Sequence, residues 1–359
     1  MTKLETPTEE KLDLAAYGWS AHFQRAADAL NFTNTMPVRV AAVHRDALDV
    51  AGPEFTGRIQ LAYLKPGGDD NPTVGDWIAL DRTTMRLAAL YPRSSLFKRR
   101  NAGNTSRSQS ILANVDTVLI VTSANLDFNV ARLERYLALA FEAGVTPVIV
   151  ITKADLAEDA DSFTETARAI RPDLAALTLN ARSADVAAQL EPRLVKGQTI
   201  ALMGSSGVGK STLVNALMGA RVQDTGGIRE DDSKGRHTTS GRSLHLLPSG
   251  AWLIDTPGMR ELQVVDVADG IDTVFDDINA LIAQCRFSDC AHGAEPGCAV
   301  RAAIECGELE PERLERFKKL QREERHNSEA AHQAHARDKA FGRMTRKIGE
   351  HKTKHMDDW

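Results

Sequence analysis

A glycine-rich segment at residues 204–211 has the residue types and spacing that bind phosphate groups. It fits the pattern G-x-x-x-x-G-K-[ST] and lies between an apolar segment at residues 199–203 and an expected helix. The glycines let successive backbone N–H groups converge on phosphate oxygens at the positive end of the helix dipole. Lys210 would reach the β- and γ-phosphates, and the Ser211 hydroxyl would bind magnesium. A chance glycine-rich turn is the alternative, which the flanking strand and helix disfavour. The residues expected to bind nucleotide here are Gly204, Ser205, Ser206, Gly207, Val208, Gly209, Lys210, Ser211 and Thr212.

A second group of residues could hold magnesium and sense the γ-phosphate. An apolar strand ends at Asp255, and Gly258 follows three positions later. In P-loop nucleotide hydrolases such an acid holds magnesium through water, and the glycine amide senses the γ-phosphate. The polar residues 225–242 are typical of a switch loop, in which Thr239 could close over magnesium. Thr238 fits that role equally by position, and a plain surface loop is the alternative for this segment.

His237 is the candidate for positioning the attacking water. Met259 stands directly after the Asp255 motif, where many GTPases place a catalytic glutamine, and methionine cannot orient water. The His237 imidazole, in the expected switch loop, could hydrogen-bond to a nucleophile near neutral pH. The alternative is that His237 only anchors the loop or contacts RNA.

Residues 152–155 could select guanine as the base. They form T-K-x-D at the end of an apolar strand, and the Asp155 carboxylate matches the N1–H and N2–H₂ donors of guanine. Lys153 would lie across the base. Thr152 replaces the usual asparagine, so the hydrogen bond from that position to the phosphate loop is open to question. At the end of the next strand, Asn180 and Ala181 would direct a backbone N–H at guanine O6.

The order of these motifs is unusual. The base-reading residue Asp155 precedes Gly204, whereas it follows the phosphate loop in ordinary GTPases. A parallel sheet tolerates such a circular permutation, because strand pairing depends on which strands are neighbours in space. The permutation places the Asp255 motif near the end of the nucleotide domain, directly ahead of a cysteine-rich segment.

This segment could hold one structural zinc ion. Cys285, Cys290, His292 and Cys298 form a C-x₄-C-x-H-x₅-C set. Three thiolates and one imidazole complete a tetrahedral shell and leave no open position for substrate. A buried core of free cysteines is the alternative. Cys306 lies outside the set, and we expect it to be packed.

The elements that must position these residues fall into blocks. After a short amphipathic helix interrupted near Gly18, short apolar runs from residue 37 predict a small β-barrel. From residue 117 to residue 218, apolar strands alternate with amphipathic helices, which predicts a parallel α/β sheet. Charged residues 308–354 favour helix.

Composition adds the setting. The 359 residues, of which 42% are apolar, predict three domains, and no long apolar run or signal-type start is present. All cysteines cluster at one metal-type site, which suits a reducing compartment. We therefore expect a soluble, cytoplasmic protein.

The net charge of −5 hides two basic regions. One contains no acidic residue in the sequence between its ends; its members are Arg82, Arg86, Arg93, Lys98, Arg99, Arg100 and Arg107. The other, from Pro311 to the C-terminus, has 13 Lys/Arg against 9 Asp/Glu and is either an RNA-binding or a salt-bridged helix. The first region favours an anionic partner.

Taken together, the sequence resembles the RsgA/YjeQ family of ribosome small subunit-dependent GTPases. The resemblance rests on the permuted nucleotide motifs and on four further segments, residues 74–77, 113–116, 235–239 and 285–300. It implies a multidomain α/β protein with an N-terminal OB-fold barrel, a circularly permuted GTPase domain and a C-terminal zinc-binding helical domain. We expect an N-terminal extension at 1–36, the barrel at 37–104, the GTPase at 105–268 and the zinc-binding and helical part at 269–359.

The resemblance also implies GTP hydrolysis with Mg²⁺, stimulated by the small ribosomal subunit during its late maturation. The expected partners are GTP or GDP and the small subunit with its rRNA, with no membrane, and we expect a monomer. A nucleotide-gated RNA-binding module in which hydrolysis is incidental is the alternative. A kinase is disfavoured because no acceptor-binding constellation is visible.

Overall fold

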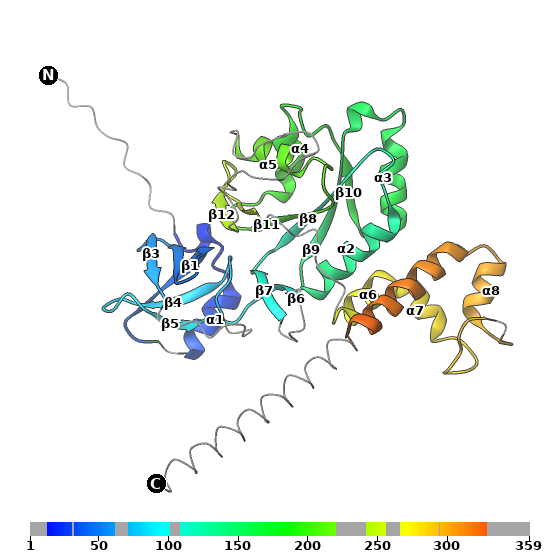
Figure 1. Cartoon of the computed structure of the whole chain (residues 1–359), viewed down its shortest axis with the longest axis horizontal. Helices are drawn as coiled ribbons and strands as arrows, with labels where there is room; N and C mark the ends of the chain where they lie inside the picture. The colour runs from blue at the N-terminus through cyan, green and yellow to red at the C-terminus, as the bar shows by residue number, and fades with distance from the viewer. Residues whose placement is uncertain are drawn as a thin grey trace, which may run out of the picture.

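The computed structural model describes residues 13–30, 32–61, 71–100, 108–219, 242–255, 266–293 and 295–328 (Figure 1). Within these ranges, no helix is both long enough and apolar enough to cross a membrane.

A largely parallel sheet forms the centre of the molecule. Its strands run in the order β10-β9-β8-β11-β13-β12, and all neighbours are parallel except β12 and β13. Every residue of β8 is buried, as expected for a strand covered on both faces. The strands are β8 (Thr117–Ser123), β9 (Thr146–Thr152), β10 (Ala175–Thr178), β11 (Thr199–Met203), β12 (Ser243–Leu246) and β13 (Trp252–Asp255).

Helices cover both faces of this sheet (Figure 1). α2 (Val130–Glu142) and α3 (Ala160–Ala169) contribute to one hydrophobic core, whereas α4 (Val186–Leu190) and α5 (Lys210–Met218) contribute to a second one. The short 3-10 helices η2 (Ala154–Leu156) and η3 (Glu191–Arg193) lie in the connections. The predicted alternation of strand and helix is confirmed, and β11 and α5 have the bounds that the sequence indicated.

A second, antiparallel group of strands precedes the central sheet, in the order β5-β4-β1-β2-β3. Ile59 of β3 and Leu87 of β5, from opposite ends of this order, pack on the same core. The group is therefore curled, although β3 and β5 are not paired among the described residues. Its strands are β1 (Thr35–Val43), β2 (Ala47–Ala51), β3 (Gly57–Gln60), β4 (Trp77–Asp81) and β5 (Leu87–Leu90).

The two groups of strands are continuous. β1 pairs with β12 at Ala42 and Ser243, which joins them into one eleven-stranded sheet. A separate hairpin consists of β6 (Leu96–Arg100) and β7 (Ser108–Ala113), and the expected boundary after residue 104 falls in its connection.

A buried arginine, Arg39 on β1, links these parts. It is 1% exposed and donates from Nη1 to the carbonyl of Tyr17 (2.8 Å) and from Nη2 to Thr199 Oγ1 (2.6 Å). Further hydrogen bonds go to the carbonyls of Asn114 (3.2 Å) and Gly75 (3.3 Å). Burial lowers the pKa of Arg39 to about 10, so the group remains charged at neutral pH. Arg39 thus holds the curled strands against the base of β11.

The N-terminal segment completes this junction. It contains η1 (Ala15–Tyr17) and α1 (Ala21–Leu30), separated by Gly18 in the left-handed conformation, as the sequence predicted. Tyr17 stacks on Trp252 of β13 with ring centroids 5.4 Å apart. The Trp252 indole N–H donates to the carbonyl of Ala16 at 2.7 Å. The segment is therefore packed between the curled strands and the central sheet.

The C-terminal part is helical, with α6 (Ala268–Val274), α7 (Asp276–Ile282), α8 (Ala299–Glu305) and a helix described over residues 311–328. Gly270 of α6 crosses α2 so closely that an added Cβ would lie 2.1 Å from the Ala138 carbonyl oxygen.

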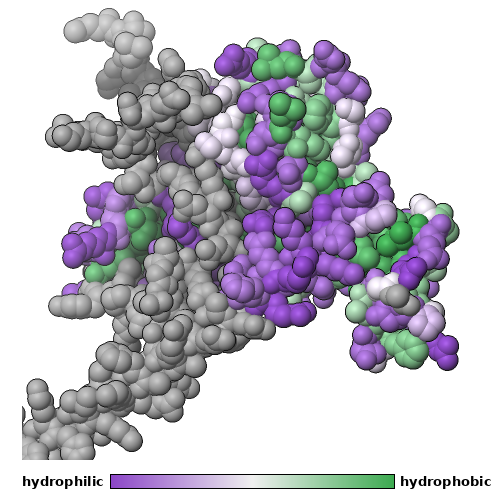
Figure 2. Space-filling view, turned by 45° about the vertical axis from the view of Figure 1, so that its right-hand side comes forward, coloured by the Kyte–Doolittle hydropathy of each residue, from purple (hydrophilic) through white to green (hydrophobic). Residues whose placement is uncertain are grey.

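A buried acid on α2 binds the last of these helices. Glu134 is 1% exposed and accepts hydrogen bonds from Arg316 (2.9 Å) and Arg313 (3.3 Å). Burial raises the pKa of Glu134 although both arginines favour its charged form. Two arginines of the last described helix are thus paired with an acid of α2, a helix that covers the central sheet. In Figure 2 hydrophilic residues gather on the surface where these helices meet that body.

Candidate functional site

The glycine-rich segment lies at the carboxyl ends of the parallel strands, where ligands bind in open α/β sheets. Gly204 has φ 148° and sits so close to β8 that a Cβ would lie 2.1 Å from the Val121 carbonyl oxygen. Gly209 has φ 97° and caps the start of α5. Ser211 and Thr212 fall in the first turn of this helix. The segment therefore has the strand–loop–helix placement of a phosphate-binding loop.

Lys210 lies folded over this loop. Its ammonium group donates to the carbonyl oxygens of Gly204 (2.7 Å) and Ser205. The side chain thus already points along the loop towards the residues expected to surround the phosphates, among which Ser206 and Gly207 are exposed.

Arg132 contacts the phosphate loop, although it belongs to none of the sequence motifs. It lies in the first turn of α2, and its Nη1 donates to Ser205 Oγ at 2.7 Å. The only signal in the sequence was a basic residue early in the helix that follows β8, the strand next to β11.

The predicted guanine-binding residues lie at and just after the end of β9, two strands from β11 in the sheet, and they are tied to the phosphate loop. Thr152 ends β9, and its hydroxyl contacts the carbonyls of Val208 at 2.5 Å and Thr122 at 3.0 Å. The tether questioned from the sequence is therefore present, with threonine as the donor. Lys153 follows in the left-handed conformation with φ 61°, and Asp155 is exposed in η2.

The loop after β10 adjoins this one. Ala154 N–H donates to the Leu179 carbonyl at 3.4 Å, which brings Asn180 and Ala181 next to the Asp155 loop. Asn180 Oδ1 accepts from the Arg182 N–H at 2.9 Å, and Ala181 is 6% exposed.

Asp255 ends β13, which pairs in parallel with β11, so it reaches the same edge of the sheet as Gly204. Three expected site residues, His237, Thr239 and Gly258, lie outside the described residues.

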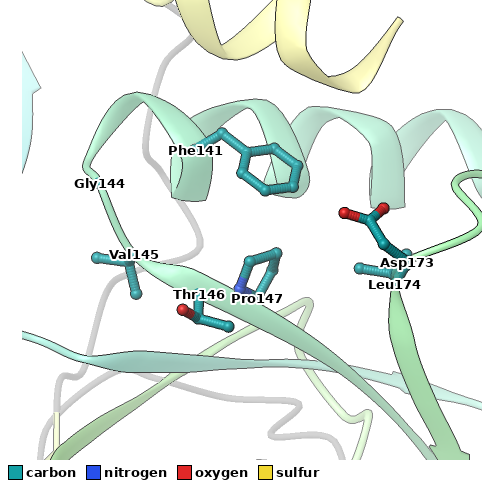
Figure 3. A pocket seen from close by; sticks show the side chains of 7 residues that line it. All are labelled: Phe141, Gly144, Val145, Thr146, Pro147, Asp173 and Leu174. Carbon is teal, nitrogen blue, oxygen red and sulfur yellow. The ribbon is translucent and has the colours of Figure 1, made fainter. Parts of the chain in front are cut away.

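A cavity of about 280 Å³ lies elsewhere in this sheet (Figure 3). Phe141, Thr146 and Pro147 line it together with Asp173. Thr146 begins β9, so the cavity is at the amino end of that strand and the phosphate loop is at the carboxyl edge. The cavity is therefore separate from the nucleotide motifs.

The predicted metal ligands come together in the C-terminal part. The ligand atoms of Cys285, Cys290, His292 and Cys298 all lie within 4.8 Å of one another. His292 Nδ1 is 3.7 Å from Cys285 Sγ and 3.6 Å from Cys298 Sγ, and these two sulfurs are 4.0 Å apart. Tetrahedral zinc with its usual bond lengths requires sulfur–sulfur distances of about 3.8 Å and sulfur–nitrogen distances of about 3.5 Å. The cluster therefore fits a zinc-type ion.

Local structure presents these ligands. Cys298 caps α8, and its sulfur accepts the Arg301 N–H at 3.4 Å. Glu295 accepts the N–H groups of Ala291 (3.0 Å) and Gly293 (2.7 Å), which closes the turn around His292. Burial lowers the pKa of His292 and so favours the neutral imidazole that binds metals.

Cys306 lies outside the cluster, as predicted, but it is exposed. The expectation that Cys306 is packed was wrong, because α8 ends at Glu305 and Cys306 is the exposed C-cap residue that follows it.

The basic region between Arg82 and Arg107 also needs correction. Arg93 forms a two-pronged ion pair at 2.8 Å with Asp76, which is fully buried, and Arg82 pairs with Glu54. Two of the seven charges are thus compensated by acids from earlier in the chain. Lys98 is exposed on β6.

Comparison with known proteins decides the family. The sequence model described as "RsgA GTPase" matches residues 90–265. A Mesorhizobium japonicum protein, "Small ribosomal subunit biogenesis GTPase RsgA", is 49% identical over 331 residues, which cover 91% of this chain and 94% of that one. The chain belongs to the RsgA family.

Other RsgA relatives agree with this. A Vibrio parahaemolyticus protein, "Small ribosomal subunit biogenesis GTPase RsgA 2", is 46% identical over 96% of this chain and 95% of its own. The crystal structure of YjeQ from Thermotoga maritima matches with a TM-score of 0.58 and 25% identity, covering 80% of this chain and 97% of that one. The structure of YloQ, described as a circularly permuted GTPase, matches with a TM-score of 0.56, 25% identity and coverage of 80% and 93%.

As an RsgA GTPase, the chain hydrolyses GTP on a circularly permuted fold. The early position of β9, ahead of β11 in the chain and two strands from it in the sheet, is that permutation seen in the structure.

Proposed function

We propose that this chain binds the small ribosomal subunit and assists its late maturation, and that the subunit stimulates its GTP hydrolysis. The names of its relatives, small ribosomal subunit biogenesis GTPases, support this function. The observation that best supports the proposed nucleotide site is the hydrogen bond from Thr152 to the Val208 carbonyl, because it joins the proposed base-binding loop to the phosphate loop.

The nucleotide would be held between these loops. Backbone N–H groups of residues 204–209 would bind its phosphates, and Lys210 would turn from its carbonyl partners to the β- and γ-phosphates. Asp155 would accept from guanine, with Lys153 across the base and the Asn180–Ala181 loop at O6.

Magnesium would bind through Ser211, Thr239 and, by way of water, Asp255, where it would neutralise charge on the phosphates. Gly258 would sense the γ-phosphate, and His237 would orient the attacking water.

The remaining parts would make the ribosomal contacts. We assign residues 37–104 as an OB-fold barrel, residues 105–268 as the GTPase domain and residues 269–359 as a zinc-binding helical domain behind an extension at 1–36. The curled strand order β5-β4-β1-β2-β3 supports the barrel. One structural zinc ion would be held by Cys285, Cys290, His292 and Cys298. Lys98, Arg99 and Arg100 would contact rRNA phosphates. We also propose that the protein is cytoplasmic and monomeric.

Turnover measured with and without purified small subunits tests this proposal. A large rise in GTP hydrolysis on adding small subunits, absent with large subunits as the matched control, is the expected result. Binding to small subunits in the GTP state without any rise in turnover would instead indicate a nucleotide-gated RNA-binding module.

Guanine selectivity has its own test. Replacing Asp155 with Asn puts a donor against guanine N1–H, so GTP affinity should fall and xanthosine triphosphate affinity should rise. Unchanged GTP affinity in Asp155→Asn would rule out the proposed base site.

A further inference from the structure

We infer that Arg132 is a positioning residue of the nucleotide site, which holds the first part of the phosphate loop through the Ser205 hydroxyl. This inference rests on the proposed nucleotide site at residues 204–212. It assigns a role to a side chain that belongs to none of the nucleotide motifs.

The guanidinium of Arg132 is also held by Asp127, through the nitrogen that does not bind the loop. Its Nη2 donates to the Asp127 carbonyl oxygen at 2.6 Å and to the Asp127 carboxylate at 3.0 Å. Asn129 caps α2 by accepting the Arg132 backbone N–H at 2.9 Å. Both the backbone and the side chain of Arg132 are therefore held before Nη1 reaches Ser205 Oγ at 2.7 Å.

The loop is attached to its surroundings at three points, of which Arg132 supplies one. Gly204 is packed against the Val121 carbonyl of β8, and Thr152 of β9 binds the Val208 carbonyl. Ser205 lies between these two points, next to the exposed Ser206 and Gly207. Without the bond to Arg132, the segment between Gly204 and Val208 would lose the hydrogen bond that attaches it to α2.

Nucleotide binding would break the hydrogen bond from Lys210 to the Ser205 carbonyl oxygen but would leave the hydrogen bond from Arg132 to the Ser205 hydroxyl intact. Lys210 donates to the carbonyl oxygens of Gly204 and Ser205, and it must leave them to reach phosphates. Arg132 instead binds the Ser205 hydroxyl, a different group from the carbonyl oxygen that Lys210 releases. The loop therefore keeps its shape while Lys210 moves, and less conformational entropy is lost when phosphate binds.

The test measures GTP and GDP affinity in two variants that remove the same hydrogen bond. Arg132→Met keeps the aliphatic stem, and Ser205→Ala removes only the acceptor. Because a hydrogen bond to a charged group contributes about 1.5–3 kcal/mol, each variant should weaken the binding of both nucleotides by up to about 10- to 150-fold. The double variant should be no weaker than the worse single one, since both changes remove one interaction.

Arg135→Met is the matched control. Arg135 lies on the same helix, its side chain is 36% exposed against 33% for Arg132, and it pairs with Glu323 instead of the loop. Nucleotide affinity should stay unchanged in this variant, and Arg132→Lys should recover part of the loss. Without nucleotide, the unfolding midpoints of Arg132→Met and Arg135→Met should be similar. A loss of nucleotide affinity in Arg132→Met alone would then reflect the position of the loop and not a general loss of stability.

Three results would overturn the inference. Wild-type affinity in both Arg132→Met and Ser205→Ala would show that the hydrogen bond does not organise the loop. Weakening of GTP alone would place Arg132 on the γ-phosphate, because GDP uses the same loop. Lys210→Ala serves as the check on the underlying site: if it leaves both affinities unchanged, the proposed nucleotide site itself fails and the inference with it.

Discussion

Replacing the buried Arg39 with Met should strongly destabilise the junction between the curled strands and the central sheet. Met retains most of the apolar stem but donates no hydrogen bond. The carbonyls of Tyr17, Gly75 and Asn114 and the hydroxyl of Thr199 would lose their partner inside a buried region.

The size of the destabilisation depends on the acids that stay buried when Arg39 is replaced. Asp76 and Asp116 both face Arg39, and burial raises the pKa of each, so losing the cation leaves their charges less compensated. Release of the Arg39 desolvation penalty offsets part of this loss, and Arg93 still pairs with Asp76. Removing one partner of a buried ionic network costs about 3–5 kcal/mol, and we expect a value in this range.

Urea unfolding followed by tryptophan fluorescence measures this change. Trp77 lies with its ring centroid 5.9 Å from the Arg39 guanidinium carbon, and Trp252 binds Ala16, so both report on the junction. Arg58→Met is the control, because Arg58 makes a two-pronged pair with Asp49 on the same group of strands but is exposed. The unfolding midpoint of Arg58→Met should move much less than that of Arg39→Met, because an exposed ion pair contributes about 1 kcal/mol or less. A loss below about 1 kcal/mol for Arg39→Met would refute the reasoning, since it would equal a single neutral hydrogen bond.

Three further predictions concern other parts of the chain. His237→Ala should lower small-subunit-stimulated turnover by about 10²–10⁴-fold while GTP affinity persists; full stimulated turnover would exclude its catalytic role. Chelation of metal, or Cys298→Ser, should unfold the C-terminal part, seen as lost helical circular dichroism, with GTP affinity retained; no spectral change would contradict a structural metal. The Arg58 hydrogen bonds lower the pKa of Asp49 to about 2, so its NMR titration should centre there and rise in Arg58→Met. The free energy of unfolding that this shift contributes is fully present above the ordinary pKa of an aspartate and is lost as the pH falls towards 2. A titration midpoint of Asp49 at the ordinary aspartate value in the wild-type protein would refute the prediction.

Patterns local to a few residues were predictable from the sequence. The strand, loop and helix around Gly204 form as predicted because glycine spacing and apolar periodicity act over short distances. The cysteine and histidine cluster was predictable for the same reason, since its ligands lie within fourteen residues.

Contacts between distant residues were not predictable. Arg39 looks like one polar residue in an apolar strand, and its partner Thr199 is 160 positions away. The number of uncompensated charges in the basic region was overestimated because Glu54 and Asp76, which precede this region in the chain, pair with Arg82 and Arg93 in the folded structure. Arg132 carried no motif, because its partner Ser205 is 73 positions later.

The junction built by Arg39 also constrains the order of events during synthesis. The curled strands can pair among themselves as soon as β5 has emerged, because all strands in the order β5-β4-β1-β2-β3 lie between residues 35 and 90. Their attachment to the central sheet must wait for Thr199 and then for Trp252, which lies 236 positions after its partner Ala16. At about 5–20 residues per second, a ribosome needs about 10–50 s to make that stretch. For this interval Ala16 and Tyr17 lack their partner Trp252, so protection of this surface by chaperones would matter most before residue 252 leaves the exit tunnel.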